Sequence, residues 1–271
     1  MDGLFDSAWL KWYWADVHTQ QLQREVNAWI NEVHGKPAIR AGGRYEPKRH
    51  CYVIYAEEIL TPYPVTWGLR IGDIAHAYRS CLDHLAWALV QRGSRASNLT
   101  ERQQKQVYFP LATSPTHFRN AARTMLPGVR RADLTLVRRY QPYASAGMRG
   151  VPSHIFTQLD RLSNADKHRT IQPAIAIPEE ATYELNGAYD CTVTRFGEKA
   201  LRMPIEVGAE LAWFYVRKRG PNPRLDVKGH LHTYPALSGS VFGAEDWLKR
   251  MAPFTRNLLS AFADPPEITV P

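Results

Sequence analysis

The segment LRIGDIAHAYRSCLDHLAWALVQRG, residues 69–93, decides the fold because it predicts a long helix with two different sides. At about 100° per residue, one stripe of this helix is apolar and consists of Ile71, Ile74, Tyr78, Leu82, Leu85 and Leu89. The other side carries Asp73, His76, Ser80, Asp83 and His84, with Trp87 among them. A solvated helix face is usually rich in Lys and Glu, and this segment has neither. We therefore expect another part of the protein to cover this polar side. The alternative is a solvated face with local pairs between its charged residues.

A second helix is predicted by SHIFTQLDRLSNADKHRTI, residues 153–171, which Pro152 and Ser153 open. Its apolar stripe is formed by Ile155, Phe156, Leu159 and Leu162, and the same 100° step places Asp166 and Arg169 on that stripe. Charged side chains on a buried stripe are costly unless they have partners. We expect the partners to be the His, Asp and Arg side chains of the 69–93 helix. The alternative is an Asp–Arg pair that only fixes the packing of helices.

The remaining pattern predicts an α+β chain. Further helices are expected over residues 4–34, 116–126, 131–143 and 244–263, with Ser114 and Pro115 at the start of the second of these. Strands are expected over residues 51–59, 181–196, 199–207, 209–219 and 230–237, whereas GKP at 35–37 and AGG at 41–43 are expected to break regular structure. The division that follows is a mainly helical domain, residues 1–174, and a β-rich part with a terminal helix, residues 175–271.

The composition of the chain limits the class of protein to which it can belong. The chain has 271 residues, of which 44% are hydrophobic and 22% charged, which is typical of a globular protein rather than a disordered one. Its net charge of +8 favours a polyanionic partner, either a nucleic acid or an acidic membrane surface. Three widely spaced cysteines, an N-terminus without a signal peptide and the lack of a run of ~20 apolar residues predict a cytoplasmic protein that does not span a membrane.

Two resemblances to known families begin in the 69–93 helix. The residues RSCLDH, Arg79 to His84, have the form R-x4-H and resemble the signature of HEPN-type ribonucleases, which are helical-bundle proteins of prokaryotic toxins and phage-defence systems. The position after the arginine is typically Asn, Asp or His in that signature, and it is Ser80 here. The wider pattern of GDIAHAYRSCLDHLAW, FPL at 109–111, YQPY at 140–143 and LSNADKHR at 162–169 is similar to a widespread family of uncharacterised bacterial proteins.

The HEPN resemblance implies RNA cleavage without a metal or other cofactor, at a site between two copies of the chain. His84 would move a proton to or from the ribose or the leaving oxygen, and Arg79 would hold the scissile phosphate. Asp83 or Asp166 would orient an imidazole, and Arg169 would add a phosphate contact; His168 completes the set of catalytic candidates. Because five residues correspond to about 140° on an ideal helix, Arg79 and His84 converge only through a long reach, a kink or a partner chain.

Arginines between Pro115 and Gly150 point to RNA independently of that resemblance. This stretch has seven arginines, one acidic residue, Asp133, and no Lys or Glu. Arginine binds phosphate in a bidentate manner, and the aromatic residues His117, Phe118, Tyr140 and Tyr143 would stack on bases. The alternative is a basic surface that only keeps the protein in solution. The arginines assigned to substrate binding are Arg119, Arg123, Arg130, Arg131, Arg138 and Arg139.

Two other classes of function stay open at this point. A metal-dependent hydrolase would draw its ligands from the helical part, where the candidates are His76, His84, His154, His168, Asp73, Asp83, Asp160 and Asp166. No HExxH or Glu-x-x-His spacing accompanies them, so the leading expectation has no metal site. A non-enzymatic module would bind RNA or another protein, such as an antitoxin, without chemistry. The leading interpretation is an RNA-binding protein with metal-independent endoribonuclease activity in phage defence or toxin action.

Overall fold

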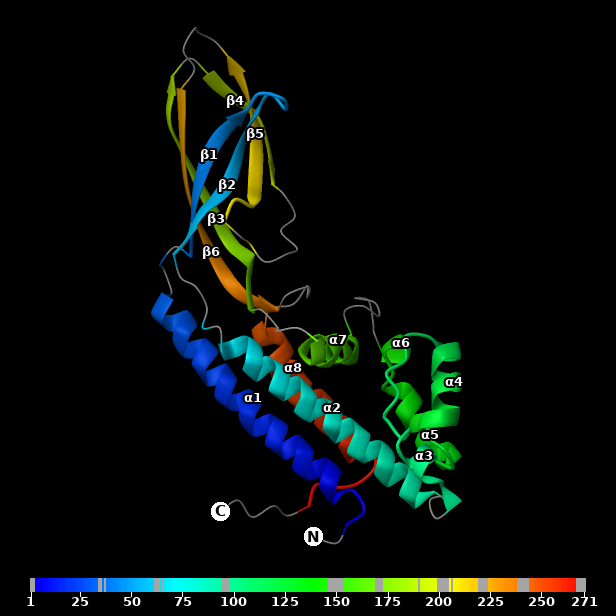
Figure 1. Ribbon diagram of the computed structural model, residues 1–271. Coiled ribbons are helices and arrows are strands. Elements are labelled where there is room, and N and C mark those ends of the chain that lie inside the picture. Colours follow the sequence, from blue (N-terminus) through cyan, green and yellow to red (C-terminus); the bar gives the residue numbers. More distant parts are fainter. Residues whose placement is uncertain are drawn as a thin grey trace. The chain divides into compact units, whose positions relative to one another are not determined.

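The computed structural model describes residues 3–33, 36, 38–60, 64, 66–93, 98–145, 154–168, 173–189, 191–198, 205, 207–218, 224–237 and 244–266. The fold is α+β, as expected, and the chain forms two compact units (Figure 1). The helical unit comprises Met1–Arg24, Gly68–Ile171 and Asp246–Pro271, and the sheet unit comprises Glu25–Trp67 and Gln172–Glu245. Each of the units is therefore assembled from segments that are far apart in the sequence.

These two units differ from the predicted division into residues 1–174 and 175–271. The two strands before residue 60 belong to the sheet unit, and the terminal helix belongs to the helical unit. The physical reason is that a two-stranded hairpin cannot bury an apolar face by itself, so it joins the strands made later. An amphipathic helix has the same need and packs on other helices.

The helical unit is built on the long helix that the opening segment predicts, α2, Thr66–Arg92. All six residues of its predicted apolar stripe are buried, each at 2% exposure or less. Helix α1, Asp6–Val33, runs alongside α2 in the opposite direction (Figure 1). A buried hydrogen bond of 3.1 Å joins the hydroxyls of Thr19 and Tyr78 across this pair. No helix in the described part of the chain combines the length and apolar character needed to cross a lipid bilayer.

Shorter helices follow α2: α3, Glu101–Gln104; α4, Pro115–Met125; α5, Arg131–Arg139; and α6, Pro142–Ser145. Helix α4 begins as predicted, with Ser114 accepting a hydrogen bond from the His117 amide and Pro115 in the first turn. After α4 the chain turns at Gly128, where φ is 75°. The carbonyl of Gly128 meets Gly93 so closely that a Cβ atom at Gly93 would clash with it. Glycine at both positions lets the turn after α4 contact the end of α2.

Helix α7, Ile155–His168, begins with an unusual cap. The imidazole Nδ1 of His154 accepts a hydrogen bond of 3.1 Å from the amide of Phe156. The ring of His154 also packs edge-to-face against Phe156 and against Phe254 of α8, Ala244–Ser260. Burial lowers the pKa of His154 to about 4, and Arg250 acts in the same direction. A neutral imidazole therefore replaces the Ser or Asp that usually caps a helix.

The described strands of the sheet unit form one antiparallel six-stranded sheet in the order β3-β6-β1-β2-β5-β4. Their bounds are Ile39–Glu46 (β1), Cys51–Ile59 (β2), Pro173–Tyr189 (β3), Cys191–Glu198 (β4), Glu210–Lys218 (β5) and Arg224–Leu237 (β6). The prediction for β2 is confirmed, but AGG at 41–43 continues a strand instead of breaking one. Strand β1 exists because β2 and β6 pair with it on both sides.

The aromatic residues of β5 mainly pack within the sheet unit. Phe214 is fully buried and stacks on its cross-strand neighbour Tyr52, with ring centroids 5.4 Å apart. Trp213 packs edge-to-face on Tyr215 and leaves no room for a side chain at Gly197 of the neighbouring strand. This cross-strand packing accounts for the aromatic run in β5 without a ligand.

Candidate functional site

The arginine and aspartate of the HEPN-like segment bind the backbone of one residue, Phe109. The Arg79 guanidinium donates a hydrogen bond of 2.9 Å to the Phe109 carbonyl, and the Phe109 amide donates one of 2.9 Å to Asp83 Oδ1. Arg79 and Asp83 also form an ion pair of 3.1 Å along α2. Both backbone groups of Phe109 are therefore satisfied by side chains that the sequence assigns to catalysis.

A second fragment of the bacterial family pattern holds the same extended segment, residues 107–112. Gln141, from YQPY, accepts a hydrogen bond of 2.8 Å from the Ala112 amide and donates one to Val137. Both Gln141 and Ala112 are fully buried. A buried backbone amide without a partner is costly, so these contacts stabilise an extended segment that no strand pairs with. RSCLDH, FPL and YQPY thus meet in one hydrogen-bonded region.

His84 has a different environment from Arg79. Its partly buried imidazole lies near Lys11 of α1, and burial and Lys11 lower its pKa, while Asp83 acts against them. Among the described residues, no hydrogen bond or ion pair joins Arg79 to His84. The 140° separation expected on an ideal helix is therefore not overcome by a kink in α2, which is helical throughout Thr66–Arg92.

Two of the other catalytic candidates lie at the end of α7. Asp166 and His168 belong to that helix, but their side chains are outside the described residues, and Arg169 lies outside them altogether. The expected convergence of Asp166 and Arg169 with His84 stays a prediction. Helix α7 does contact the 107–112 segment, because Phe156 packs edge-to-face on Phe109 with ring centroids 6.1 Å apart.

The candidate metal ligands do not form a cluster in the described structure. No group of three or more His, Cys, Asp or Glu side chains that could hold a metal ion occurs among the described residues. Asp83 is engaged with Arg79 and Phe109, and His154 caps α7. His168 and Asp166 lie outside the described side chains. The described geometry therefore gives the hydrolase alternative no support.

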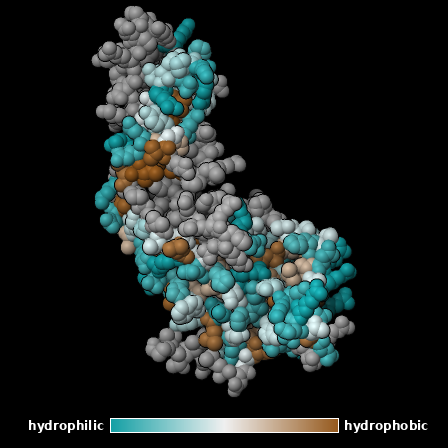
Figure 2. Space-filling view, viewed as in Figure 1, coloured by the Kyte–Doolittle hydropathy of each residue, from teal (hydrophilic) through white to brown (hydrophobic). Residues whose placement is uncertain are grey.

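The six candidate substrate-binding arginines are all exposed, on α4, on α5 and at the residue that precedes α5. We call this set the arginine surface: Arg119, Arg123, Arg130, Arg131, Arg138 and Arg139. Figure 2 shows hydrophilic residues over this side of the helical unit. No carboxylate in the described ranges forms an ion pair with any of these arginines.

The single acidic residue of this stretch, Asp133, does not offset their charge. It is buried and binds Arg92 of α2 through two hydrogen bonds, Nη2 to Oδ1 at 2.6 Å and Nε to Oδ2 at 3.2 Å. Arg92 further donates to the Phe262 carbonyl and lies over the ring of Phe5. The carboxylate of Asp133 is therefore neutralised inside the protein, and the positive charge of the arginine surface faces solvent.

The expected base-stacking role of the nearby aromatic residues needs correction for three of the four. Phe118 is buried and packs on Tyr143, while Tyr140 packs edge-to-face on Phe254 and donates a hydrogen bond to the Asn257 carbonyl. Only His117 is exposed. Phe118 and Ala121 lie three residues apart on the buried side of α4, a spacing that indicates packing. The arginine surface thus offers phosphate contacts, with little aromatic surface for bases.

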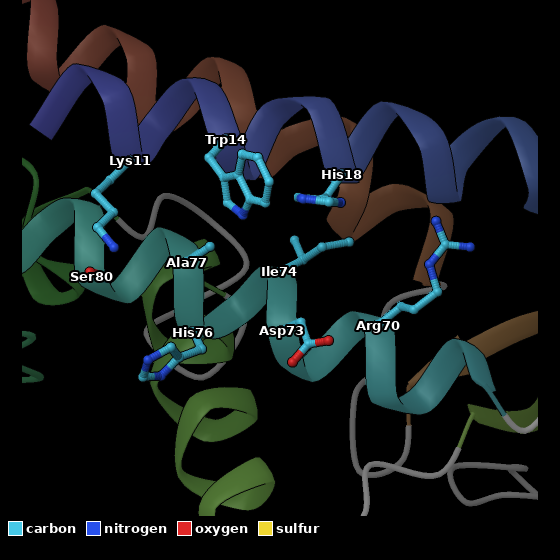
Figure 3. Close-up of a pocket in the computed structure, with 9 residues that line it drawn as sticks. All are labelled: Lys11, Trp14, His18, Arg70, Asp73, Ile74, His76, Ala77 and Ser80. Atoms are coloured by element: carbon cyan, nitrogen blue, oxygen red, sulfur yellow. The ribbon is translucent and has the colours of Figure 1, made fainter.

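A groove between α1 and α2 was not predicted from the sequence (Figure 3). We call it the α1–α2 groove. Its volume is about 400 Å³, and it is lined by Lys11, Trp14 and His18 of α1 and by Arg70, Asp73, Ile74, His76, Ala77 and Ser80 of α2. The spacing of residues 11, 14 and 18 places them on one helix face, and this is the signal that could have revealed the groove. Asp73 and His76 of the polar side of α2 are exposed, so the expected cover is not found over these two residues.

Comparisons with known proteins add nothing to this geometry: no protein-family model, no curated protein and no solved structure matches the chain.

Proposed function

We propose that this protein binds RNA through the arginine surface of α4 and α5. The observation that carries the proposal is a group of six exposed guanidinium groups whose one acidic neighbour, Asp133, is bound to Arg92. Positive charges this close repel one another, and a polyanion relieves that repulsion while it releases its own counterions. Arginine rather than lysine supplies every positive charge of this stretch, which suits bidentate contacts to phosphate oxygens.

The proposal is tested by removing charge from the surface without removing buried groups. The variant carries four substitutions, Arg130→Gln, Arg131→Gln, Arg138→Gln and Arg139→Gln, all at exposed positions. Fluorescence anisotropy with a labelled RNA is measured at several salt concentrations. Each lost phosphate contact lowers the slope of log K against log salt by about 0.7 for a single strand. We expect a smaller slope and an affinity at least ten-fold lower.

The matched control removes exposed arginines from elsewhere in the helical unit. Arg24→Gln and Arg102→Gln lie on α1 and α3, outside the arginine surface, and both positions are exposed. The control should retain nearly all the affinity and salt dependence. If the control weakens binding as much as the four-fold variant, only net charge matters, and the arginine surface is not the binding site.

A metal-independent HEPN-type endoribonuclease is the second candidate, and one observation favours it. The lowered pKa of His84 keeps its imidazole neutral near pH 7, so it can accept a proton from a ribose hydroxyl, and Lys11 lies near it. Arg79 is less suited to hold a phosphate, because its guanidinium binds Phe109 and Asp83. Cleavage would therefore depend on His84 directly and on Arg79 through the position of the 107–112 segment.

Incubation with total RNA in EDTA tests this second candidate. His84→Ala should abolish cleavage and leave the free energy of unfolding nearly unchanged, since the side chain is only partly buried. Arg79→Ala should reduce cleavage in proportion to the loss of folded protein. Cleavage that survives in His84→Ala, or no cleavage by the wild type, would leave RNA binding as the function.

A further inference from the structure

The α1–α2 groove combines aromatic surface with positive charge, which the arginine surface does not. Its volume of about 400 Å³ is within the usual range for small-ligand sites. Lys11 contributes positive charge from α1, and Asp73 contributes the one carboxylate among the lining residues. Arg70 also lines the groove and interacts with another residue of the chain. A site of this size and composition suits a ligand that has both an anionic group and a flat ring.

Trp14 is the most unusual residue of the groove. It is 61% exposed, although tryptophan is highly buried on average in folded proteins. The ring of His18 packs edge-to-face on the indole, with centroids 4.5 Å apart and planes at 70°. Such a contact orients the indole and leaves much of its face uncovered. An oriented, exposed indole is a stacking platform for another aromatic ring.

The positively charged side chains lie on both sides of this platform. Figure 3 shows Lys11 beside Ser80 at one end of the groove and Arg70 pointing towards α1 at the other, with Trp14 between them. Asp73 and His76 project from α2 away from α1 in the same view. Residues 11 and 18 are separated by about 10 Å along α1, from seven residues at a rise of 1.5 Å each. The α1 side of the groove thus presents the ammonium group of Lys11 near the exposed indole of Trp14.

We infer that the α1–α2 groove binds one nucleotide unit of a single-stranded RNA, with its base stacked on Trp14 and a flanking phosphate held by Lys11. This inference rests on the proposed function for its class of ligand, but it uses none of the residues of the arginine surface. A paired base is stacked inside its duplex and is unavailable to an indole, so the ligand is single-stranded.

The test measures the affinity of the full-length protein for a labelled single-stranded 12-mer of uridine. Trp14→Ala should weaken binding about 5- to 100-fold, the usual effect of losing one stacked base. Trp14→Phe should retain most of the affinity, because a phenyl ring still stacks. Lys11→Gln should lower the salt slope by about 0.7, as expected for one lost phosphate contact. Val17→Ala is the matched control, because Val17 is exposed on α1 but does not line the groove.

Inorganic polyphosphate, which has no bases, separates stacking from charge. Its affinity should fall in Lys11→Gln and stay unchanged in Trp14→Ala. If Trp14→Ala weakens polyphosphate binding and RNA binding equally, the indole only shapes the site and the inference is overturned. The inference is also overturned if uridine monophosphate binds as tightly as the 12-mer, because the ligand is then a free nucleotide. Trp14-dependent binding to anionic phosphatidylserine vesicles, without binding to RNA, would replace RNA by a membrane surface.

The two proposals fail in distinguishable ways. Loss of RNA affinity in the four-fold arginine variant, with wild-type affinity in Trp14→Ala, supports the arginine surface and overturns the groove. The reverse pattern supports the groove and overturns the arginine surface. If the wild type binds neither single-stranded nor duplex RNA, both proposals are wrong.

Discussion

Two sets of arginines in the helical unit have the same side chain and opposite surroundings. Arg79 and Arg92 each bind a carboxylate and a backbone carbonyl, through Asp83 with Phe109 and through Asp133 with Phe262. The arginine surface has no described carboxylate partner. The comparison teaches that residue type alone does not indicate function, since a guanidinium with a partner in its own chain fixes the fold. Guanidinium groups without one are suited to bind something else.

The comparison predicts the largest loss of stability when the carboxylate partner of Arg92 is removed. Asp133→Ala leaves Arg92 half-buried without its carboxylate, and we expect the free energy of unfolding to fall by about 3 kcal/mol. Urea denaturation followed by circular dichroism measures the change. The control is Glu101→Ala, whose ion pair with Lys105 is fully exposed and should be worth less than about 0.5 kcal/mol. Equal losses in the two variants would contradict a structural role for the Arg92–Asp133 pair.

His154 extends the comparison to a group that must stay uncharged. Its pKa is about 4 in the folded protein and near 6.5 when unfolded, so the unfolded chain binds a proton first as the pH falls. Stability from this group is therefore present above pH 6.5 and is lost between pH 6.5 and 4. We expect a loss of about 2 to 3 kcal/mol, measured by urea denaturation across that range.

The matched variant is His154→Asn, which keeps a side-chain acceptor for the Phe156 amide and cannot titrate. It should be less stable than the wild type at pH 7, because the aromatic packing on Phe156 and Phe254 is reduced. Its stability should vary less between pH 6.5 and 4. An unchanged pH dependence would show that another group causes the acid sensitivity.

Arg79→Ala tests whether Arg79 contributes to folding or to RNA binding. Loss of the hydrogen bond to the Phe109 carbonyl should cost about 1 to 2 kcal/mol, since Asp83 still holds the Phe109 amide. The affinity for RNA, measured where the variant is fully folded, should be unchanged. A large loss of RNA affinity at an unchanged free energy of unfolding would instead show that Arg79 belongs to the RNA-binding site.

The smallest effect is expected on the arginine surface itself. Arg119 and Arg123 are four residues apart on α4, so their like charges repel. Arg119→Gln should raise the free energy of unfolding by about 0.2 to 0.5 kcal/mol at low salt, and the gain should disappear at high salt as the charges are screened. Thermal unfolding at two salt concentrations measures it. A loss of stability would mean that the hydrogen bond from Arg119 to the Thr116 hydroxyl outweighs the repulsion.

Much of the fold was predictable because its signals are local. The apolar stripe of α2 and the Ser114–Pro115 start of α4 are set by residues within one or two turns. Strand β1 was not predictable, because Gly42 and Gly43 have low strand propensity and only pairing with β2 and β6 makes this segment a strand.

The residue types of the candidate site could be predicted from the sequence, but most of their contacts could not. The sequence identified the exposed arginines, since charge without acidic neighbours is visible in a list of residues. It could not reveal that Arg79 and Asp83 bind the backbone of Phe109. Nearly every residue has the same backbone N–H and C=O groups, so the sequence does not show which of them a side chain binds. The groove was missed because Trp14 lies among several tryptophans of α1, and burial alone distinguishes it from Trp9.

The strand order has a consequence for how the protein is made. The hairpin of β1 and β2 occupies the middle of the sheet, yet its outer neighbours, β5 and β6, are translated only in the last third of the chain. A nascent chain on the ribosome therefore holds a hairpin with two open edges, a state prone to pair with other chains. Truncation after residue 174 would make that state permanent, so the helical part should not be produced by cutting the gene there.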